Sequence, residues 1–189
     1  MSKNQSNELS RFRTLIAKDY KRVEGKKNRE EIRDLLELFV DNCPSKEGPE
    51  NAKKFKNYNI EYGAHYSKLK NIIIASIGLK DKDTYRWYEN APELEGQIAD
   101  IEQLYAKRRK AVVFFTKDNY GEMDSLYIRI RNSFAHGNYF KIKDYYYLWN
   151  ETRGKKYSRL GSFMVLKYEH LKKIYMALHD FELSRTIKK

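Results

Sequence analysis

We predict a mainly α-helical fold, a bundle of helices with one β-hairpin before the C-terminal helix. Apolar residues recur at helical spacing through most of the 189 residues. The chain has only three prolines, so few positions would interrupt a helix, and it has no internal repeat. One region, residues 139–167, changes to aromatic and β-branched residues, which are typical of strands.

Two apolar stripes predict the first two helices. Asn28 and Glu31, three residues apart, form a capping-box pattern that opens the second helix. A loop with two prolines then extends from Asp41 to Asn57. The stripes consist of Leu9, Phe12, Ile16 and Val23, and of Ile32, Leu35, Leu36, Phe39 and Val40.

Start and stop signals place three further helices. Gly78 and Gly137 each follow an apolar stripe and are typical of a helix end. Pro92, between Asn90 and Glu93, is typical of a helix start. The predicted helices cover residues 58–77, then Leu94 to Val112 after the loop 79–90, and then a helix that Asn119 and Glu122 open and that ends at Gly137-Asn138.

The hairpin and the last helix complete the prediction. The expected strands are Tyr139–Asn150 and Tyr157–Lys167, joined by a polar turn that contains Gly154. The last helix covers residues 168–184. We expect a flexible N-terminus over residues 1–7 and a single domain over residues 8–185.

Composition narrows the class of protein. Lys and Arg number 38 against 26 Asp and Glu, a net charge of +12 that favours polyanions such as RNA as partners. Apolar runs such as Ile72 to Ala75 are far shorter than the roughly 18 residues that cross a membrane. Cys43 is the single cysteine, which excludes an internal disulfide and a cysteine zinc cluster. We expect a cytoplasmic protein with no secretion signal and no membrane partner.

The chemistry-bearing residues are Arg131, Asn132 and His136, at the end of the predicted fifth helix. Arginine holds a phosphate with two parallel hydrogen bonds, and histidine exchanges protons near neutral pH. Asn132 and His136 are four residues apart and share a helix face. Arg131 lies about 140° around the helix from His136, so one helix does not aim both at one point. Two copies facing each other do so more easily, which favours a homodimer.

The string from Ile130 to Asn138, IRNSFAHGN, resembles the R-x4-H signature of the HEPN superfamily, as found in bacterial defence and toxin proteins. The resemblance covers about nine residues, together with the expected helical bundle. It implies a metal-independent endoribonuclease that acts as a homodimer and uses no cofactor. His136 would be the general acid or base, Arg131 would neutralise charge on the phosphoryl oxygens, and Asn132 would orient His136 or hold a phosphate oxygen.

The resemblance also implies a toxic effector of a toxin–antitoxin or anti-phage system, with an antitoxin or defence protein as a possible partner. A bare R-x4-H is weak, and His136 could simply cap its helix. Two other functions therefore stay open: non-catalytic RNA binding, and a dimeric scaffold. For the basic run Lys107 to Lys110 there are two interpretations, a surface that follows an RNA backbone and a solvated helix face, and we expect the second. The expected RNA-binding residues are Lys141, Lys143, Arg153, Lys155 and Lys156, and we expect no metal site.

Overall fold

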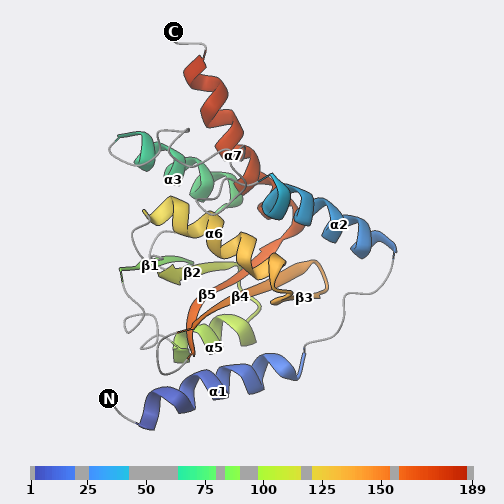
Figure 1. Cartoon of the computed structure of the whole chain (residues 1–189), viewed down its shortest axis with the longest axis vertical. Helices are drawn as coiled ribbons and strands as arrows, with labels where there is room; N and C mark the ends of the chain where they lie inside the picture. Colours follow the sequence, from blue (N-terminus) through green and yellow to red (C-terminus); the bar gives the residue numbers. More distant parts are fainter. Residues whose placement is uncertain are drawn as a thin grey trace.

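The computed structural model shows three layers, with a β-sheet between two layers of helices (Figure 1). Helices α1 and α5 lie on one side of the sheet, and α6 lies on the other with α2, α3 and α7. The structure describes residues 3–19, 26–42, 64–79, 84–89, 98–115, 121–153 and 158–186.

The sheet has five strands in the order β1-β2-β5-β4-β3. β1 pairs with β2 in parallel, and the other neighbours pair antiparallel, so the sheet is mixed. The strands are β1 (Tyr85–Tyr88), β2 (Ala111–Phe115), β3 (Tyr139–Ile142), β4 (Tyr145–Arg153) and β5 (Ser158–Lys167).

Six α-helices and one π-helical turn make up the helical layers of the described residues. The π turn continues α2 without a break, and its end is marked by the N–H of Asn42, which donates to the carbonyl of Glu37 (3.0 Å). The helices are α1 (Lys3–Ala17), α2 (Lys26–Leu36), η1 (Glu37–Asp41), α3 (Ala64–Ile77), α5 (Ile98–Ala106), α6 (Glu122–Ala135) and α7 (Tyr168–Thr186).

Each face of the sheet has its own hydrophobic core. Along β2, Val112 and Phe114 pack against the α6 side, whereas Val113 and Phe115 pack against the α1 and α5 side. Successive side chains of a strand point to opposite faces, so both faces of β2 are buried. This is why all five residues of β2 are apolar and buried.

The predicted mainly α-helical bundle with one hairpin is therefore wrong, because the chain forms a mixed α/β fold around a five-stranded sheet. The expected fourth helix ends at Ala106, and Ala111–Phe115 form β2. A strand buried on both faces has no alternation of apolar and polar residues, and its short apolar run looks like part of a helical stripe. β1 lies within the expected loop over residues 79–90.

The expected hairpin is correct in its pairing, since β4 and β5 are antiparallel neighbours. Its first half contains an additional turn at Lys143-Asp144, which separates β3 from β4. The last helix forms as expected. The helix that begins at Lys3 includes part of the expected flexible N-terminus. Val23, most of the loop 41–57, residues 58–63 and Asn119 lie outside the described residues.

Tyrosine hydroxyl groups join the helical layers to the sheet and to each other. Tyr85 on β1 donates to the carboxylate of Glu122 on α6 (2.7 Å), which also forms an ion pair with Lys70 on α3 (3.3 Å). Both groups of the tyrosine–carboxylate pair are buried, so the hydrogen bond offsets the cost of removing them from water. Three more pairs follow the same scheme: Tyr146 with Glu31, Tyr105 with Asp19, and Tyr168 with Asp34.

The guanidinium of Arg129, a fully buried residue of α6, lies in a bulge of the sheet. Its Nη1 donates to Oδ1 of Asn150 on β4 (2.9 Å), and its carbon lies 4.4 Å from the centre of the Phe115 ring on β2. The pairing of β4 with β5 shifts at Asn150/Glu151 and leaves out Gly161. A Cβ atom on Gly161 would lie 2.4 Å from Nη1 of Arg129. The missing side chain of Gly161 thus provides the space for this guanidinium.

We predict that Gly161→Ala lowers the free energy of unfolding by about 1–3 kcal/mol, because the added methyl group overpacks this site. The guanidinium cannot move aside without losing its bond to Asn150, and the carbonyl of Asn150 itself would lie 3.1 Å from the new Cβ. Urea denaturation measures the change. The matched control is Gly121→Ser, where a Cβ meets no atom within 4 Å and serine suits the N-cap of α6. Equal stability of the two variants would contradict this account of Arg129.

Candidate functional site

The Arg131–His136 motif occupies the last turns of α6 and its C-terminal cap. Gly137 has a φ of +68°, and its N–H donates to the carbonyl of Phe134 (3.1 Å). The N–H of Asn138 donates to the carbonyl of Ser133 (2.8 Å). These two bonds form a Schellman cap, so the helix stop predicted at Gly137-Asn138 is confirmed. The cap turns the chain from α6 into the edge strand β3.

Asn132 connects the other two residues of the motif. Its side-chain oxygen accepts a hydrogen bond from Nη1 of Arg131 (3.2 Å). Its backbone carbonyl accepts the N–H of His136 (3.0 Å). Arg131 and Asn132 are half-buried, whereas the imidazole of His136 is exposed at the helix end. The structure therefore presents an imidazole to solvent at the helix end, while the guanidinium of Arg131 is hydrogen-bonded to the amide that lies between them in the sequence.

Arg131 and His136 are not bonded to each other. In the described part of the chain, no hydrogen bond or ion pair joins their side chains. The Nε of Arg131 is buried and has no hydrogen-bond partner. A single copy of the chain thus brings the two groups to one helix end without joining them.

Aromatic side chains pack around Phe134, the buried residue within the motif. Phe134, inside the motif, stacks on Phe39 of the π turn, with ring centres 6.0 Å apart. On its other side it meets Tyr139 at the start of β3, at 5.2 Å. Phe39 belongs to the π turn itself, so this turn packs directly against the motif helix.

Ser133 and Arg129 are supporting residues that the sequence analysis missed. The hydroxyl of Ser133 lies 2.9 Å from the carbonyl of Arg129 and 2.8 Å from that of Trp149 on β4. The contact with Trp149 links α6 to the sheet at Ser133, a position between Arg131 and His136 in the sequence. Arg129 stands between Ile128 and Ile130, and an arginine flanked by buried apolar residues is the one signal that could have indicated its burial.

Lys141, an expected RNA-binding residue, is paired with side chains of α2 in the structure. Its ammonium lies 2.6 Å from the carboxylate of Glu31 and 2.9 Å from Oδ1 of Asn28. Tyr146 donates to the same carboxylate (2.7 Å). Burial raises the pKa of Glu31, but the hydrogen bonds from Lys141 and Tyr146 outweigh burial and lower it overall. Asn28 and Glu31 thus hold α2 to the sheet, and α2 begins before them, at Lys26.

The structure describes the position of two other expected RNA-binding residues, Lys143 and Arg153, near opposite ends of β4. Lys143 is exposed in the turn between β3 and β4, with a φ of +53°. Arg153 ends β4, at the opposite end of that strand. Lys155 and Lys156 lie outside the described residues. Of these residues, only Lys143 has a described side chain, and no described interaction brings it next to His136.

The basic run at residues 107–110 divides into two parts. Lys107, Arg108 and Arg109 are exposed after the end of α5, not on its face as expected. The ammonium of Lys110 instead donates to the carbonyl of Ile77 at the end of α3. Burial lowers the pKa of Lys110, and the nearby charges of Lys173 and Lys167 lower it further.

His170 is the second histidine whose side chain the structure places. Its Nδ1 accepts the N–H of Lys167 (3.2 Å), which caps the start of α7 in the manner of a capping box. Burial lowers the pKa of His170, and the charge of Lys110 adds to the effect. His170 therefore has a structural role.

The described residues contain no group of three or more His, Cys, Asp or Glu side chains placed to hold a metal ion. No helix among them has the length and apolar character needed to cross a membrane. Comparison of the chain with protein-family models, with curated proteins and with solved structures gives no match.

We predict that Glu31→Gln lowers the free energy of unfolding by about 1–3 kcal/mol at pH 7, because it removes the charge that faces the poorly exposed ammonium of Lys141. The lowered pKa means that folded Glu31 binds a proton less readily than unfolded Glu31. The advantage of the wild type is therefore present above the ordinary pKa of 4.5 and shrinks as the pH falls below it.

Urea denaturation at neutral and at acidic pH checks this prediction. The matched control is Glu30→Gln, which changes an exposed carboxylate on the same helix and should alter stability little at either pH. A difference between wild type and Glu31→Gln that stays constant with pH would rule out the proposed role of this carboxylate.

Proposed function

We propose that the protein is a metal-independent endoribonuclease whose active residues are Arg131, Asn132 and His136. One observation carries the proposal: a solvent-exposed imidazole and a guanidinium that Asn132 orients occupy the same capped helix end. A net charge of +12 favours a polyanionic substrate. The residue string resembles the HEPN signature, although the fold is not the helical bundle that this resemblance implied.

RNA supplies the nucleophile for the proposed reaction. The 2′-oxygen attacks the adjacent phosphorus and loses its proton to a general base, while the 5′-oxygen leaves with a proton from a general acid. His136 takes one of these two roles. Arg131 neutralises the charge that grows on the phosphoryl oxygens. The products are a 2′,3′-cyclic phosphate and a 5′-hydroxyl, and DNA is resistant because it lacks the 2′-hydroxyl.

The complete site in this proposal belongs to a homodimer. Arg131 and His136 are not bonded to each other within one chain, and two facing helix ends would supply two histidines and two arginines to one cleft. One histidine can then act as the base and the other as the acid. We further propose a cytoplasmic location and a role as the toxic effector of a toxin–antitoxin or anti-phage system, held in check by an antitoxin or defence protein.

We predict that His136→Ala lowers kcat for RNA cleavage by about 10²–10⁴-fold, the usual contribution of a general acid or base. The assay uses labelled single-stranded and structured RNA in EDTA, with identification of the cyclic phosphate ends. The matched control is His170→Gln, which replaces the other placed histidine by a residue that can also cap α7 and leaves cleavage intact.

The same assay separates the alternatives. Equal cleavage by wild type and His136→Ala would remove His136 from the reaction. Salt-sensitive RNA binding without cleavage would replace the proposal by a non-catalytic RNA-binding function. Dimerisation without any RNA affinity would replace it by a scaffold function.

A composite site also predicts that activity depends on protein concentration. Specific activity should fall as the protein is diluted below the dissociation constant of the dimer, because each monomer holds only part of the site. Cleavage rates over a dilution series, compared with the mass measured by light scattering, test this expectation. A specific activity that is constant in a fully monomeric solution would refute the shared site.

A further inference from the structure

The cap at the end of α5 has an arginine in a backbone conformation that favours glycine. The N–H of Arg108 donates to the carbonyl of Tyr105 (3.0 Å), and that of Arg109 to the carbonyl of Leu104 (3.1 Å). This is the Schellman pattern of hydrogen bonds, with Arg108 in the left-handed position at a φ of +49°. A side chain with a Cβ atom is disfavoured in this region, where glycine is not.

The chain offers its own comparison. α3 and α6 end in the same pair of hydrogen bonds, and the left-handed residue in those two caps is Gly78 (φ +60°) and Gly137 (φ +68°). Only the cap of α5, among these three, has an arginine in the glycine position. Strained residues of this kind persist where the side chain has a use, so the outlier points to a function for Arg108.

Arg108 is the centre of a basic turn that we define as Lys107, Arg108 and Arg109. All three side chains are exposed, and in the described part of the chain none of them has an ion-pair or hydrogen-bond partner. Other basic residues do have such partners: Arg11 with Glu102, Arg13 with Glu151, Arg86 with Asp100 and Lys141 with Glu31. The basic turn therefore concentrates uncompensated positive charge.

Packing places the basic turn beside the sheet edge at which the motif lies. Tyr105, in the last turn of α5, packs against Phe140 of the edge strand β3, with ring centres 6.4 Å apart. Burial raises the pKa of Tyr147 on β4, and the charge of Arg108 partly offsets that rise, as expected if the two residues are near. Phe140 follows His136 by four residues, which span at most about 14 Å, so the start of β3 joins the motif to the place where Tyr105 packs.

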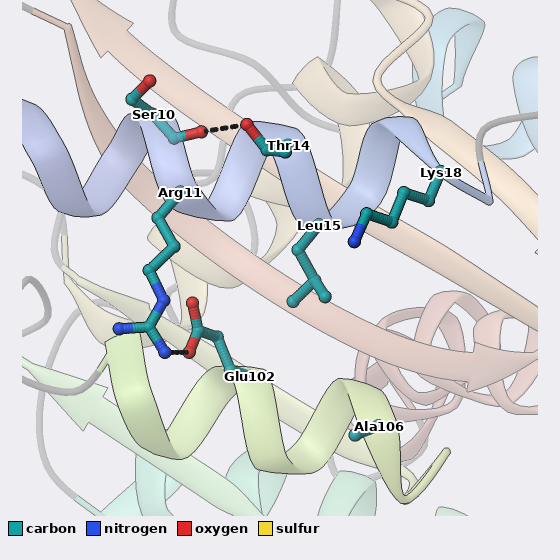
Figure 2. Close-up of a pocket in the computed structure, with 7 residues that line it drawn as sticks. All are labelled: Ser10, Arg11, Thr14, Leu15, Lys18, Glu102 and Ala106. Carbon is teal, nitrogen blue, oxygen red and sulfur yellow. Dashed lines mark hydrogen bonds and ion pairs between the residues drawn. The ribbon is translucent and has the colours of Figure 1, made fainter.

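A groove between α1 and α5 continues from this point. It encloses about 570 Å³, and Figure 2 shows Lys18 and Ala106 toward one end of it and the Arg11–Glu102 ion pair toward the other. Tyr105 donates to Asp19 (2.5 Å), which fixes the end of α1 beside the end of α5. Lys18 lines this groove together with Ala106, the last residue of α5, and the carboxylate of Asp19 lies at the same end.

We propose that the basic turn binds the phosphate backbone of a single-stranded RNA substrate that extends from His136 across the β3 edge toward the groove between α1 and α5. This inference rests on the proposed ribonuclease function and specifies its substrate as a strand several nucleotides long, held outside the site of cleavage. The contacts go to phosphates, so they add affinity without sequence preference.

The first test compares binding of a long single-stranded RNA to His136→Ala protein, with and without the changes K107Q, R108G and R109Q. Glycine at position 108 suits the left-handed backbone, so the variant keeps its helix cap. We expect weaker binding by fluorescence anisotropy, and a slope of log affinity against log salt that is smaller by about 2, since each phosphate contact with a single strand contributes about 0.7.

A matched control removes the same number of charges elsewhere. K68Q, R29Q and R33Q change three exposed basic residues of α3 and α2, on the other side of the sheet, and should leave most of the affinity in place. An equal loss of affinity in this control would overturn the proposal, because net charge alone would then explain binding. Unchanged affinity in the basic-turn variant would also overturn it.

Cleavage by otherwise wild-type protein provides the second test. A dinucleotide reaches only the cleavage site, so the basic-turn variant should cleave it as fast as wild type, while KM for the long RNA rises. If no RNA is cleaved by the wild type but the basic turn still governs binding, the ribonuclease function fails and the inference about the surface stands. If cleavage occurs and both substrates respond equally, the inference fails and the function stands.

Stability gives an independent readout. R108G alone should raise Tm by about 2–4 °C, because it relieves a left-handed conformation, and should weaken RNA binding at the same time. If Arg108 had a purely structural role, a more stable variant would not bind RNA more weakly. An increase in Tm without any loss of affinity would show that Arg108 is not used for RNA.

Discussion

The position of α6 depends on one buried cation. Arg129 enters the bulge opposite Gly161 and joins β2, β4 and α6 through Phe115, Asn150 and its own backbone. Placing a charged group in the interior costs free energy unless its surroundings compensate the charge, so this group tolerates little rearrangement around it. Two residues further along the same helix comes Arg131, and the Ser133 hydroxyl contacts the sheet between Arg131 and His136. The rotation of α6 about its axis, and hence the direction of the whole motif, is therefore fixed from inside the protein.

The sequence predicted the elements whose signals are local. The stops at Gly78 and Gly137 and the pairing of β4 with β5 follow from turn chemistry and residue type, and the structure contains all of them. The sheet could not be predicted from the sequence, because β2 is buried on both faces and β1 has only four residues. Their pairing brings together segments whose partnership no spacing in the chain reveals. Periodicity alone assigned Val112 to a helix.

The candidate site shows the same division. The cluster of Arg131, Asn132 and His136 could be predicted, since it lies within six residues of one helix. The supporting contacts could not be predicted, because they join distant parts of the chain. Lys141 illustrates the limit: beside the motif it looks like a ligand for RNA, but Glu31, 110 residues earlier in the sequence, already compensates its charge. Counting positive charges near a motif thus overestimates those that remain available to a ligand.

The two edges of the sheet have a consequence for how copies of this protein can meet. β1 and β3 are each four residues long, and each carries one basic residue, Arg86 or Lys141, held in an ion pair with a helix of the same chain. Short, charged edges are poor templates for adding a further strand. A second molecule that extended the sheet would gain few backbone hydrogen bonds and would pair alongside a charged residue. Association by strand addition is therefore unfavourable at both edges, which leaves helices and loops as the surfaces for specific assembly and protects an aromatic-rich sheet against fibrous aggregation.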